Sequence, residues 1–304
     1  LYQEGWGQDC SYCTSIRNHL MKILVTGATG FIGSHLICEL LKNKSNQIIA
    51  TSRNIEKAKN FEWFSKVEYI EYNFNDTTTK DLYEFFGKPE QLIHLAWESL
   101  SNYKSLDHID IILPNHCNFI ERMIVGGLKD MVVIGTCFEY GMIEGCLSED
   151  MGVNPVNPYA IAKDSLRRFI VDLQKRQNLT YKWVRLFYVY GTGQSKTSLM
   201  YILNEAIQNK DKIFNMSGGE QLRDFSPIDK VVRNISLIAK QNIYINQVVN
   251  CCSGNPISVK KLVENYLEEK KHVIKLNFDY YPYPDYEPME FWGCDLKLKR
   301  ILAE

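Results

Sequence analysis

The sequence predicts an α/β fold in which a doubly wound parallel sheet carries a smaller C-terminal α/β lobe. Three observations predict it. Short apolar runs alternate with amphipathic segments, a glycine-rich turn directly follows the first apolar run, and a chain of 304 residues is long enough for two lobes. Because helices cover both faces of a parallel sheet, its strands are expected as short continuous apolar runs.

The individual elements follow from apolar periodicity. Strands are expected at 22–26, 47–52, 67–72, 92–96, 130–135, 182–188 and near 246–251, the last returning to the main sheet. Helices are expected at 31–43, 79–86, 111–126, from about Pro158, 199–208 and 258–269. Asn157 is expected to cap the helix that starts at Pro158, because its side chain accepts from a first-turn N–H. Residues 1–20 match no pattern, and we expect an N-terminal extension, a wrongly assigned start or an expression remnant, with the fold beginning at Met21.

Composition argues against nucleic-acid and membrane partners. Hydrophobic residues make up 45% and charged residues 23%, and a net charge of −1 supplies no attraction to polyanions. No apolar run approaches the roughly 18 residues of a membrane span. Glu4, Gln8 and Asp9 interrupt any secretory leader. We therefore expect a cytoplasmic protein.

The nine cysteines predict neither a disulfide framework nor a metal site. They are odd in number and scattered through expected strands and helices. Cys10-Ser-Tyr-Cys13 is the single C-x-x-C, and no second pair or suitably spaced histidine completes a zinc site. Reduced structural thiols are the expectation.

The glycine turn predicts a dinucleotide site. Gly27, Gly30 and Gly33 lie between the strand at 22–26 and the helix that follows, so first-turn N–H groups and the helix dipole can receive a pyrophosphate. Glycine is needed where a Cβ would block the turn or the phosphate. No Gly-Lys-Ser/Thr follows, which argues against a nucleoside-triphosphate loop.

The end of the second expected strand indicates which dinucleotide binds. An acidic residue there would bind the adenosine ribose of NAD, but this chain has Ser52 and Arg53. A guanidinium and a hydroxyl suit a 2′-phosphate, so NADP(H) is favoured over NAD(H), which stays possible. A solvated surface arginine is the alternative interpretation of Arg53.

A proton-handling pair lies farther along the chain. Tyr159 and Lys163 are at i and i+4 of an expected helix, on one face, and a nearby ammonium should lower the tyrosine pKa. Thr136 ends the strand at 130–135 and delivers a hydroxyl to the edge of the sheet where ligands bind. These three side chains are the candidate catalytic residues.

Together these motifs resemble the extended short-chain dehydrogenase/reductases over nearly the whole chain after residue 20. The segments that carry the resemblance are Thr26 to Gly33, His94-Leu-Ala-Trp97, Thr136 ahead of Glu-Tyr-Gly, Tyr159 with Lys163, and Arg185 to Gly191. The resemblance implies a Rossmann-type NADP-binding domain over 21–190, a substrate-binding lobe over 191–304, a nucleoside-diphosphate sugar as substrate, and a homodimer. It also implies that Thr136 and Tyr159 hydrogen-bond the reacting sugar oxygen while Lys163 holds the nicotinamide ribose.

Further cofactor and substrate contacts are implied by the same resemblance. The cofactor contacts implied beside the glycines are Phe31, Ile32, Asn73, Phe74, Leu95, Ala96 and Trp97. Asn73-Phe74 stands where the family often has an adenine-binding aspartate, so that contact is altered. In the second lobe Arg223 is the candidate for the diphosphate, with an internal salt bridge to Asp224 or Asp229 as the alternative. Tyr188 replaces a frequent asparagine, and Tyr280 to Trp292, with Glu287, either lines the pocket or packs the lobes.

The reaction is narrowed by groups that the chain lacks. The family's 4,6-dehydratases carry Thr-Asp-Glu where this chain has Thr136-Cys137-Phe138, and phenylalanine cannot transfer a proton. Phe138 also replaces the cysteine of 3,5-epimerase/reductases, and no histidine lies between His116 and His272. What remains is redox chemistry at C4, and Arg53 favours a reductase that consumes NADPH. The overall pattern, including Gly135 to Gly141 and Glu287 to Gly293, resembles the 4-keto-6-deoxy-sugar nucleotide reductases of bacterial surface-polysaccharide pathways. This resemblance implies NADPH-dependent reduction of the C4 ketone of a nucleoside-diphosphate 4-keto-6-deoxy sugar. The alternatives are an NAD-dependent C4 epimerase and a non-catalytic dinucleotide-binding protein.

Overall fold

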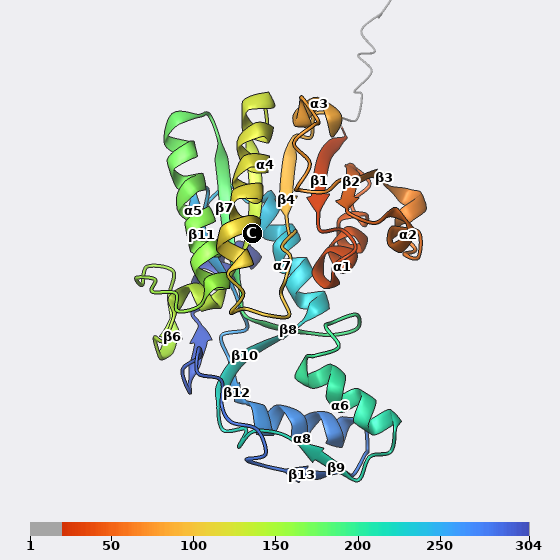
Figure 1. Ribbon diagram of the computed structural model, residues 1–304, viewed down its shortest axis with the longest axis vertical. Helices are drawn as coiled ribbons and strands as arrows, with labels where there is room; N and C mark the ends of the chain where they lie inside the picture. Colours follow the sequence, from red (N-terminus) through yellow and green to blue (C-terminus); the bar gives the residue numbers. More distant parts are fainter. Residues whose placement is uncertain (1–19, 304) are drawn as a thin grey trace, which may run out of the picture.

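The protein is described here by a computed structural model that covers residues 20–303. Its centre is one parallel sheet (Figure 1), made of β1 (Met21–Thr26), β2 (Asn46–Ser52), β3 (Glu68–Glu71), β4 (Gln91–His94), β5 (Asp130–Thr136), β7 (Thr180–Leu186) and β11 (Gln247–Cys251). The spatial order is β11-β7-β5-β4-β1-β2-β3. From β1 the chain adds β2 and β3 on one side and then β4, β5, β7 and β11 on the other. Open parallel sheets bind ligands at the point between β1 and β4 where this order of addition changes sides. The predicted Rossmann-type fold is confirmed.

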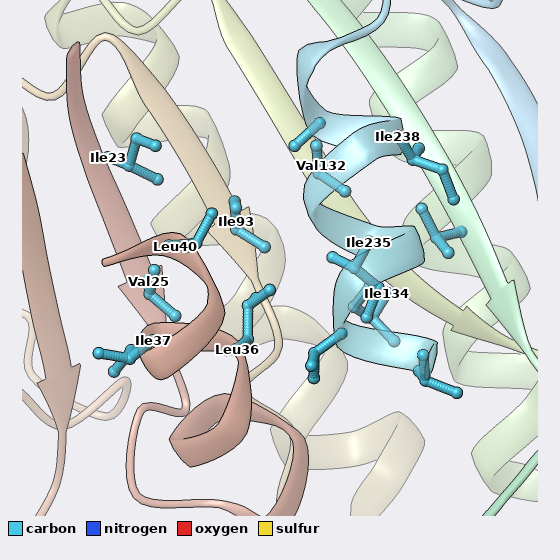
Figure 2. Packing of buried hydrophobic residues seen from close by; sticks show 14 of the residues in the cluster. Ile23, Val25, Leu36, Ile37, Leu40, Ile93, Val132, Ile134, Ile235 and Ile238 are labelled. Carbon is cyan, nitrogen blue, oxygen red and sulfur yellow. The ribbon is translucent and has the colours of Figure 1, made fainter. Parts of the chain in front are cut away.

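Helices cover both faces of this sheet. On one face lie α1 (Phe31–Leu40), α7 (Ile228–Lys240) and α9 (Leu296–Leu302), and on the other α3 (Leu82–Phe85), α4 (Leu113–Gly126) and α5 (Pro158–Arg176). Figure 2 shows the first face, where apolar side chains of α1 and α7 meet those of the strands: Leu36, Ile37, Leu40, Ile235 and Ile238 against Ile23, Val25, Ile93, Val132 and Ile134. Burial of these side chains fixes both helices on the sheet and so fixes the turn ahead of α1.

The second lobe has a core of its own. A three-stranded sheet of β8 (Tyr188–Tyr190), β10 (Leu222–Pro227) and β12 (Pro256–Ser258) connects it to the main sheet (Figure 1). Beyond it, α6 (Leu199–Gln208) and α8 (Val259–Glu269) pack with the pair β9 (Ile213–Asn215) and β13 (Lys275–Asn277) around Leu203 and Val263. A last pair, β6 (Gly145–Leu147) with β14 (Phe291–Gly293), joins the C-terminal segment to the loop after β5.

Three predicted boundaries differ from the structure for local reasons. The helix predicted at 31–43 ends at Leu40, whose carbonyl accepts from Asn46 Nδ2 at 2.8 Å. The helix predicted at 79–86 is helical only from Leu82 to Phe85, because the Asp81 side chain caps it. The strand predicted at 182–188 is two strands, since the chain leaves the main sheet after β7 and β8 pairs with β10.

Two further sequence predictions concern the chain ends and membranes. The extension at 1–20 and the Cys10–Cys13 pair lie outside the described residues, apart from an exposed Leu20. Within residues 20–303 no helix is both long and apolar enough to cross a bilayer.

Candidate active site

The turn between β1 and α1 has the geometry of a dinucleotide cradle. Gly27 has φ +70°, and a Cβ on it would lie 2.8 Å from the Ala96 nitrogen. A Cβ on Gly33 would lie 2.2 Å from the Gly27 carbonyl oxygen, so α1 can approach the turn only with glycine there. Gly30 caps the helix without a side chain, which leaves first-turn N–H groups for a ligand. A pyrophosphate fits this position.

We expect Gly33→Ala to weaken nicotinamide-cofactor binding by more than tenfold and to lower the free energy of unfolding by about 1–3 kcal/mol, because the new methyl displaces the turn. Fluorescence titration with NADPH and urea unfolding measure the two effects. Gly152→Ala is the matched control, since a Cβ at Gly152 meets nothing within 4 Å. Equal behaviour of the two variants would contradict the steric argument.

Thr26 ties the glycine turn to the end of β4. Its hydroxyl oxygen accepts from the backbone N–H groups of Leu95 and Ala96, both at 3.2 Å. The segment His94 to Trp97, which the sequence predicts at the cofactor, is therefore held directly against the turn. The backbone of Leu95 and Ala96 lies closest to Gly27.

The predicted adenosine contacts gather at the ends of β2 and β3. Arg53 and Asn73 line one surface hollow of about 370 Å³, together with Glu71, Tyr72, Asp76, Thr79 and Phe85. The Ser52 hydroxyl lies beside it, bonded to Thr29 Oγ1 at 3.0 Å and to the Tyr69 hydroxyl at 2.8 Å. Phe74 turns the other way: its ring is buried and stacks on His116 at 4.5 Å between centroids. Phe74 therefore does not line the hollow.

Thr136 is positioned at the end of β5 by its own turn. It caps the short 3₁₀ helix Cys137–Tyr140, with its hydroxyl oxygen accepting from Phe138 N–H at 3.3 Å. Its hydroxyl proton is therefore free to be donated. The Thr136 side chain lies close enough to Tyr159 to act to lower its pKa, so the two side chains are neighbours.

Tyr159 and Lys163 project from the first turns of α5. As predicted, Asn157 caps this helix by accepting from Ala160 N–H at 2.9 Å. The expected lowering of the Tyr159 pKa by Lys163 is wrong for the protein without cofactor: burial, followed by the neighbouring Tyr103, raises that pKa. The Lys163 ammonium faces Trp97 instead, 4.3 Å from the centre of its ring.

Lys163 is itself strongly perturbed. Its side chain is buried, and desolvation lowers its pKa to about 8, with a smaller opposing effect from Glu139. The second ring near its ammonium is Trp183, at 5.6 Å. At neutral pH the ammonium still carries its proton and can donate to a ribose hydroxyl.

We expect activity to fall as the pH rises through about 8, because Lys163 loses its proton there and with it the charge and a donor for the ribose. The pH profile of kcat/KM reports the free enzyme and measures this loss. In Lys163→Arg the basic limb should vanish, since a guanidinium does not titrate in this range. A wild-type profile that stays flat to about pH 9 would contradict the assignment.

A fully buried ion pair lies directly beneath Thr136. Glu139 accepts from the Thr136 backbone N–H at 2.9 Å, from Trp183 Nε1 at 2.9 Å and from Arg185 Nε at 2.8 Å. The Arg185 guanidinium in turn stacks on the Tyr140 ring at 4.4 Å. Glu139 and Arg185 belong to motifs of the sequence, but the sequence indicates no role for either. Both side-chain partners of Glu139 come from β7, and the sequence alone does not show that β7 lies beside this turn.

Aromatic side chains form a wall over Tyr159. Tyr103 stacks on it with 5.1 Å between centroids and an interplanar angle of 26°, and its backbone carbonyl accepts from Tyr159 N–H at 3.1 Å. Phe138 and Tyr286 each pack against Tyr103, at 5.3 and 6.1 Å. Phe138 also meets Tyr188 at 6.3 Å. The wall thus runs from the candidate proton donor to the second lobe.

The second lobe brings Tyr188 and Arg223 together through Glu287. The Tyr188 hydroxyl donates to Glu287 Oε2, and Arg223 Nε donates to the same oxygen at 3.0 Å. Arg223 also donates to the carbonyls of Leu222 and Met289 and is 3% exposed. Arg223 thus forms an internal salt bridge, as the alternative interpretation predicted, but its partner is Glu287. The two predicted partners are wrong: Asp224 accepts from the Ser253 and Gly254 N–H groups, and Asp229 lies 4.0 Å from His35 Nδ1.

Comparisons with known proteins agree with this geometry. A profile of the NAD dependent epimerase/dehydratase family matches residues 23–252. The chain belongs to this family. The match spans the glycine turn, Thr136, Tyr159 and Lys163, and the family resemblance predicted from the sequence is confirmed. The family's description names NAD, so a nicotinamide cofactor is confirmed, while the preference for NADP(H) stays a prediction.

Individual relatives cover nearly the whole chain. It is 30% identical over 277 residues to a dTDP-6-deoxy-L-talose 4-dehydrogenase (NAD(+)) from Aggregatibacter actinomycetemcomitans, covering 90% of this chain and 100% of that protein. It is 25% identical to a CDP-abequose synthase from Yersinia pseudotuberculosis, covering 93% and 98%. Among solved structures, a UDP-glucuronic acid 4-epimerase from Bacillus cereus in complex with UDP-glucuronic acid and NAD has a TM-score of 0.79 at 25% identity, covering 93% of both chains.

Proposed function

We propose that this chain interconverts a C4 ketone and a C4 alcohol on a nucleoside-diphosphate 6-deoxy sugar, in the reductive direction as a 4-keto reductase. The observation that carries the proposal is the pair of groups available for proton transfer, Thr136 at the end of β5 and Tyr159 on α5. Thr136 and Tyr159 lie together, while Phe138 stands where a further acid or base would be needed for dehydration. The names of the two relatives given above, a 4-dehydrogenase and a synthase of a deoxysugar nucleotide, support this substrate class.

The residues of the chain divide the chemistry among them. When bound, the nicotinamide cofactor supplies the hydride that reduces C4. Thr136 and Tyr159 hydrogen-bond the C4 oxygen, and Tyr159 donates its proton as negative charge develops there. Because burial raises the pKa of Tyr159, the phenol is protonated at neutral pH, which is the form a proton donor requires. Lys163 holds the nicotinamide ribose with its ammonium.

Residues of both lobes are proposed to bind the sugar ring and the diphosphate of the substrate. The aromatic wall of Tyr103, Phe138 and Tyr286 offers apolar faces to a deoxy sugar ring. Arg223 is proposed to hold the diphosphate, which requires its guanidinium to turn from Glu287 when the substrate enters. The substrate diphosphate must therefore compete with the Glu287 carboxylate for Arg223.

Arg53 underlies the proposal that the reductant is NADPH. Its guanidinium is more than half exposed beside the hollow at the ends of β2 and β3, where a 2′-phosphate would lie. A reductase consumes its cofactor and exchanges it with solution, as NADPH would be, whereas an epimerase recycles bound NAD. We place the reaction in the synthesis of deoxysugar nucleotides for bacterial surface polysaccharides.

The test is cofactor oxidation with a panel of nucleoside-diphosphate 4-keto-6-deoxy sugars that differ in base and stereochemistry. We expect stoichiometric loss of absorbance at the nicotinamide band with at least one member of the panel, and faster loss with NADPH than with NADH. Cofactor binding without turnover across the whole panel would contradict the proposal and favour a dinucleotide-binding protein without catalysis.

A second candidate is NAD-dependent C4 epimerisation. Relatives with this activity in their names support it, among them a UDP-glucose 4-epimerase from Lactobacillus helveticus that is 24% identical over 81% of this chain. The same Thr136, Tyr159 and Lys163 set would serve it. Cofactor retained through purification, together with inversion at C4 and no net cofactor consumption, identifies the epimerase.

A further inference from the structure

A series of hydrogen-bonded polar side chains runs through the core from the glycine turn to the adenosine hollow. Thr26 Oγ1 lies 2.9 Å from His94 Nδ1, and His94 Nε2 lies 2.8 Å from His116 Nδ1. His116 Nε2 then lies 3.0 Å from Glu98 Oε2. Thr26 and both histidines are fully buried, and none of the roles proposed above uses the histidines or Glu98.

The hydrogen bonds of this series can be donated in one direction only, from Thr26 toward Glu98. The Thr26 oxygen already accepts from two backbone N–H groups, so its remaining contact must be its own O–H donating to His94 Nδ1. His94 therefore carries its proton on Nε2 and donates to His116 Nδ1. His116 in turn donates from Nε2 to Glu98. Burial lowers the pKa of both histidines, which keeps them neutral as this arrangement requires.

The series ends on a carboxylate that faces Arg53. Glu98 Oε2 is occupied by His116, while Oε1 lies 3.8 Å from the NH1 atom of Arg53. Burial raises the pKa of Glu98, but the hydrogen bond from His116 and the positive charge of Arg53 outweigh this and lower it. Glu98 is thus a charged group in a fixed position, 21% exposed, beside the cationic group proposed to receive a 2′-phosphate.

We propose that Glu98 is a specificity-determining residue that opposes Arg53 and reduces the preference of this chain for NADPH over NADH. The proposal rests on the nicotinamide cofactor of the proposed function. A 2′-phosphate must displace Glu98 from Arg53 and lie near its negative charge, which costs binding energy. A 2′-hydroxyl meets no such repulsion and can donate to Glu98 Oε1.

The buried histidines explain why Glu98 cannot simply turn away. A surface glutamate would rotate into solvent when a phosphate arrived, at little cost. Here rotation would leave the His116 donor unpaired inside the core, which is expensive. The same series is anchored at Thr26, which also holds Leu95 and Ala96 against the glycine turn. Cofactor choice is therefore coupled to the cradle itself.

The experiment measures dissociation constants for NADPH and NADH by protein fluorescence titration, without any sugar. In Glu98→Gln, which keeps an acceptor for His116, we expect the ratio of NADPH affinity to NADH affinity to rise about tenfold. In Arg53→Gln we expect the ratio to fall about tenfold. In the double variant, Glu98→Gln should change the ratio by less than about threefold, because the arginine it opposes is gone.

Glu84→Gln is the matched control, since it removes the same charge from an exposed carboxylate paired with Lys88 at 2.7 Å. We expect its affinity ratio to equal that of the wild type. An unchanged or lower ratio in Glu98→Gln, an equal rise in Glu84→Gln, or a wild type that binds neither cofactor would overturn the proposal. The titrations contain no sugar, so they test Glu98 separately from the reaction. If the affinity ratio changes as expected but the 4-keto panel gives no turnover, only the proposed reaction is contradicted. If the panel gives turnover but the affinity ratio does not change, only the role of Glu98 is contradicted.

Discussion

Replacing Tyr159 by phenylalanine should reduce turnover about a thousandfold, within the range that general acid catalysis contributes. The substitution removes one hydroxyl and leaves the ring stacked on Tyr103, so we expect the cofactor dissociation constant and the melting temperature to stay unchanged. Steady-state kinetics with the active 4-keto sugar nucleotide measure the loss. Almost all of it should fall on kcat, because the proton is needed only as charge develops on the C4 oxygen.

Tyr103→Phe is the matched control for this prediction. Both phenols lie in the same aromatic wall, and burial raises the pKa of Tyr103 to about 12, but Thr136 acts on the pKa of Tyr159 and not on that of Tyr103. We expect Tyr103→Phe to retain at least a tenth of wild-type turnover. A Tyr159→Phe enzyme that retains as much would show that another group supplies the proton.

Replacing Glu139 by alanine should lower the free energy of unfolding by about 3–5 kcal/mol, because it leaves the Arg185 guanidinium charged, buried and without its carboxylate. The Thr136 N–H and Trp183 Nε1 lose their acceptor as well. Urea unfolding followed by circular dichroism measures the loss. Turnover at a temperature where the variant is folded should also fall, since Thr136 is then free to move.

Two variants separate the buried pair from a general effect of charge. Glu139→Gln keeps an acceptor oxygen and should cost less than the alanine variant. Asp172→Ala breaks the exposed ion pair with Arg176 on the surface of α5 and should cost less than about 1 kcal/mol. If Glu139→Ala were no more costly than Asp172→Ala, the buried pair would contribute nothing to the stability of the site.

The fold was predictable from sequence because its signals are local. The apolar run ending at Thr26, the glycines after it and the cap at Asn157 each act within a few residues, and each is found where it was expected. The helix α7 was missed although its buried side chains Ile228, Val231, Val232 and Ile235 have helical spacing. This spacing is a local signal and is sufficient to predict the helix.

Much of the site could not be predicted, because its contacts join distant segments. Glu139 meets Arg185 across 46 residues, Arg223 meets Glu287 across 64, and His94 meets His116 across 22. The expected effect of Lys163 on Tyr159 failed for a related reason. The i, i+4 spacing places both side chains on one face of α5, but the burial that raises the pKa of Tyr159 depends on Tyr103 and other residues outside the helix.

The central claim is that this chain reduces a sugar ketone at C4 with a proton from Tyr159. The most direct measurement uses nicotinamide cofactor deuterated at the transferable position with the nucleoside-diphosphate 4-keto-6-deoxy sugar, and follows the product by mass spectrometry and NMR. We predict one deuterium at sugar C4 for each cofactor oxidised, and loss of this product in Tyr159→Phe. Product formed without deuterium at C4, or epimerised sugar formed with no net cofactor oxidation, would contradict the account.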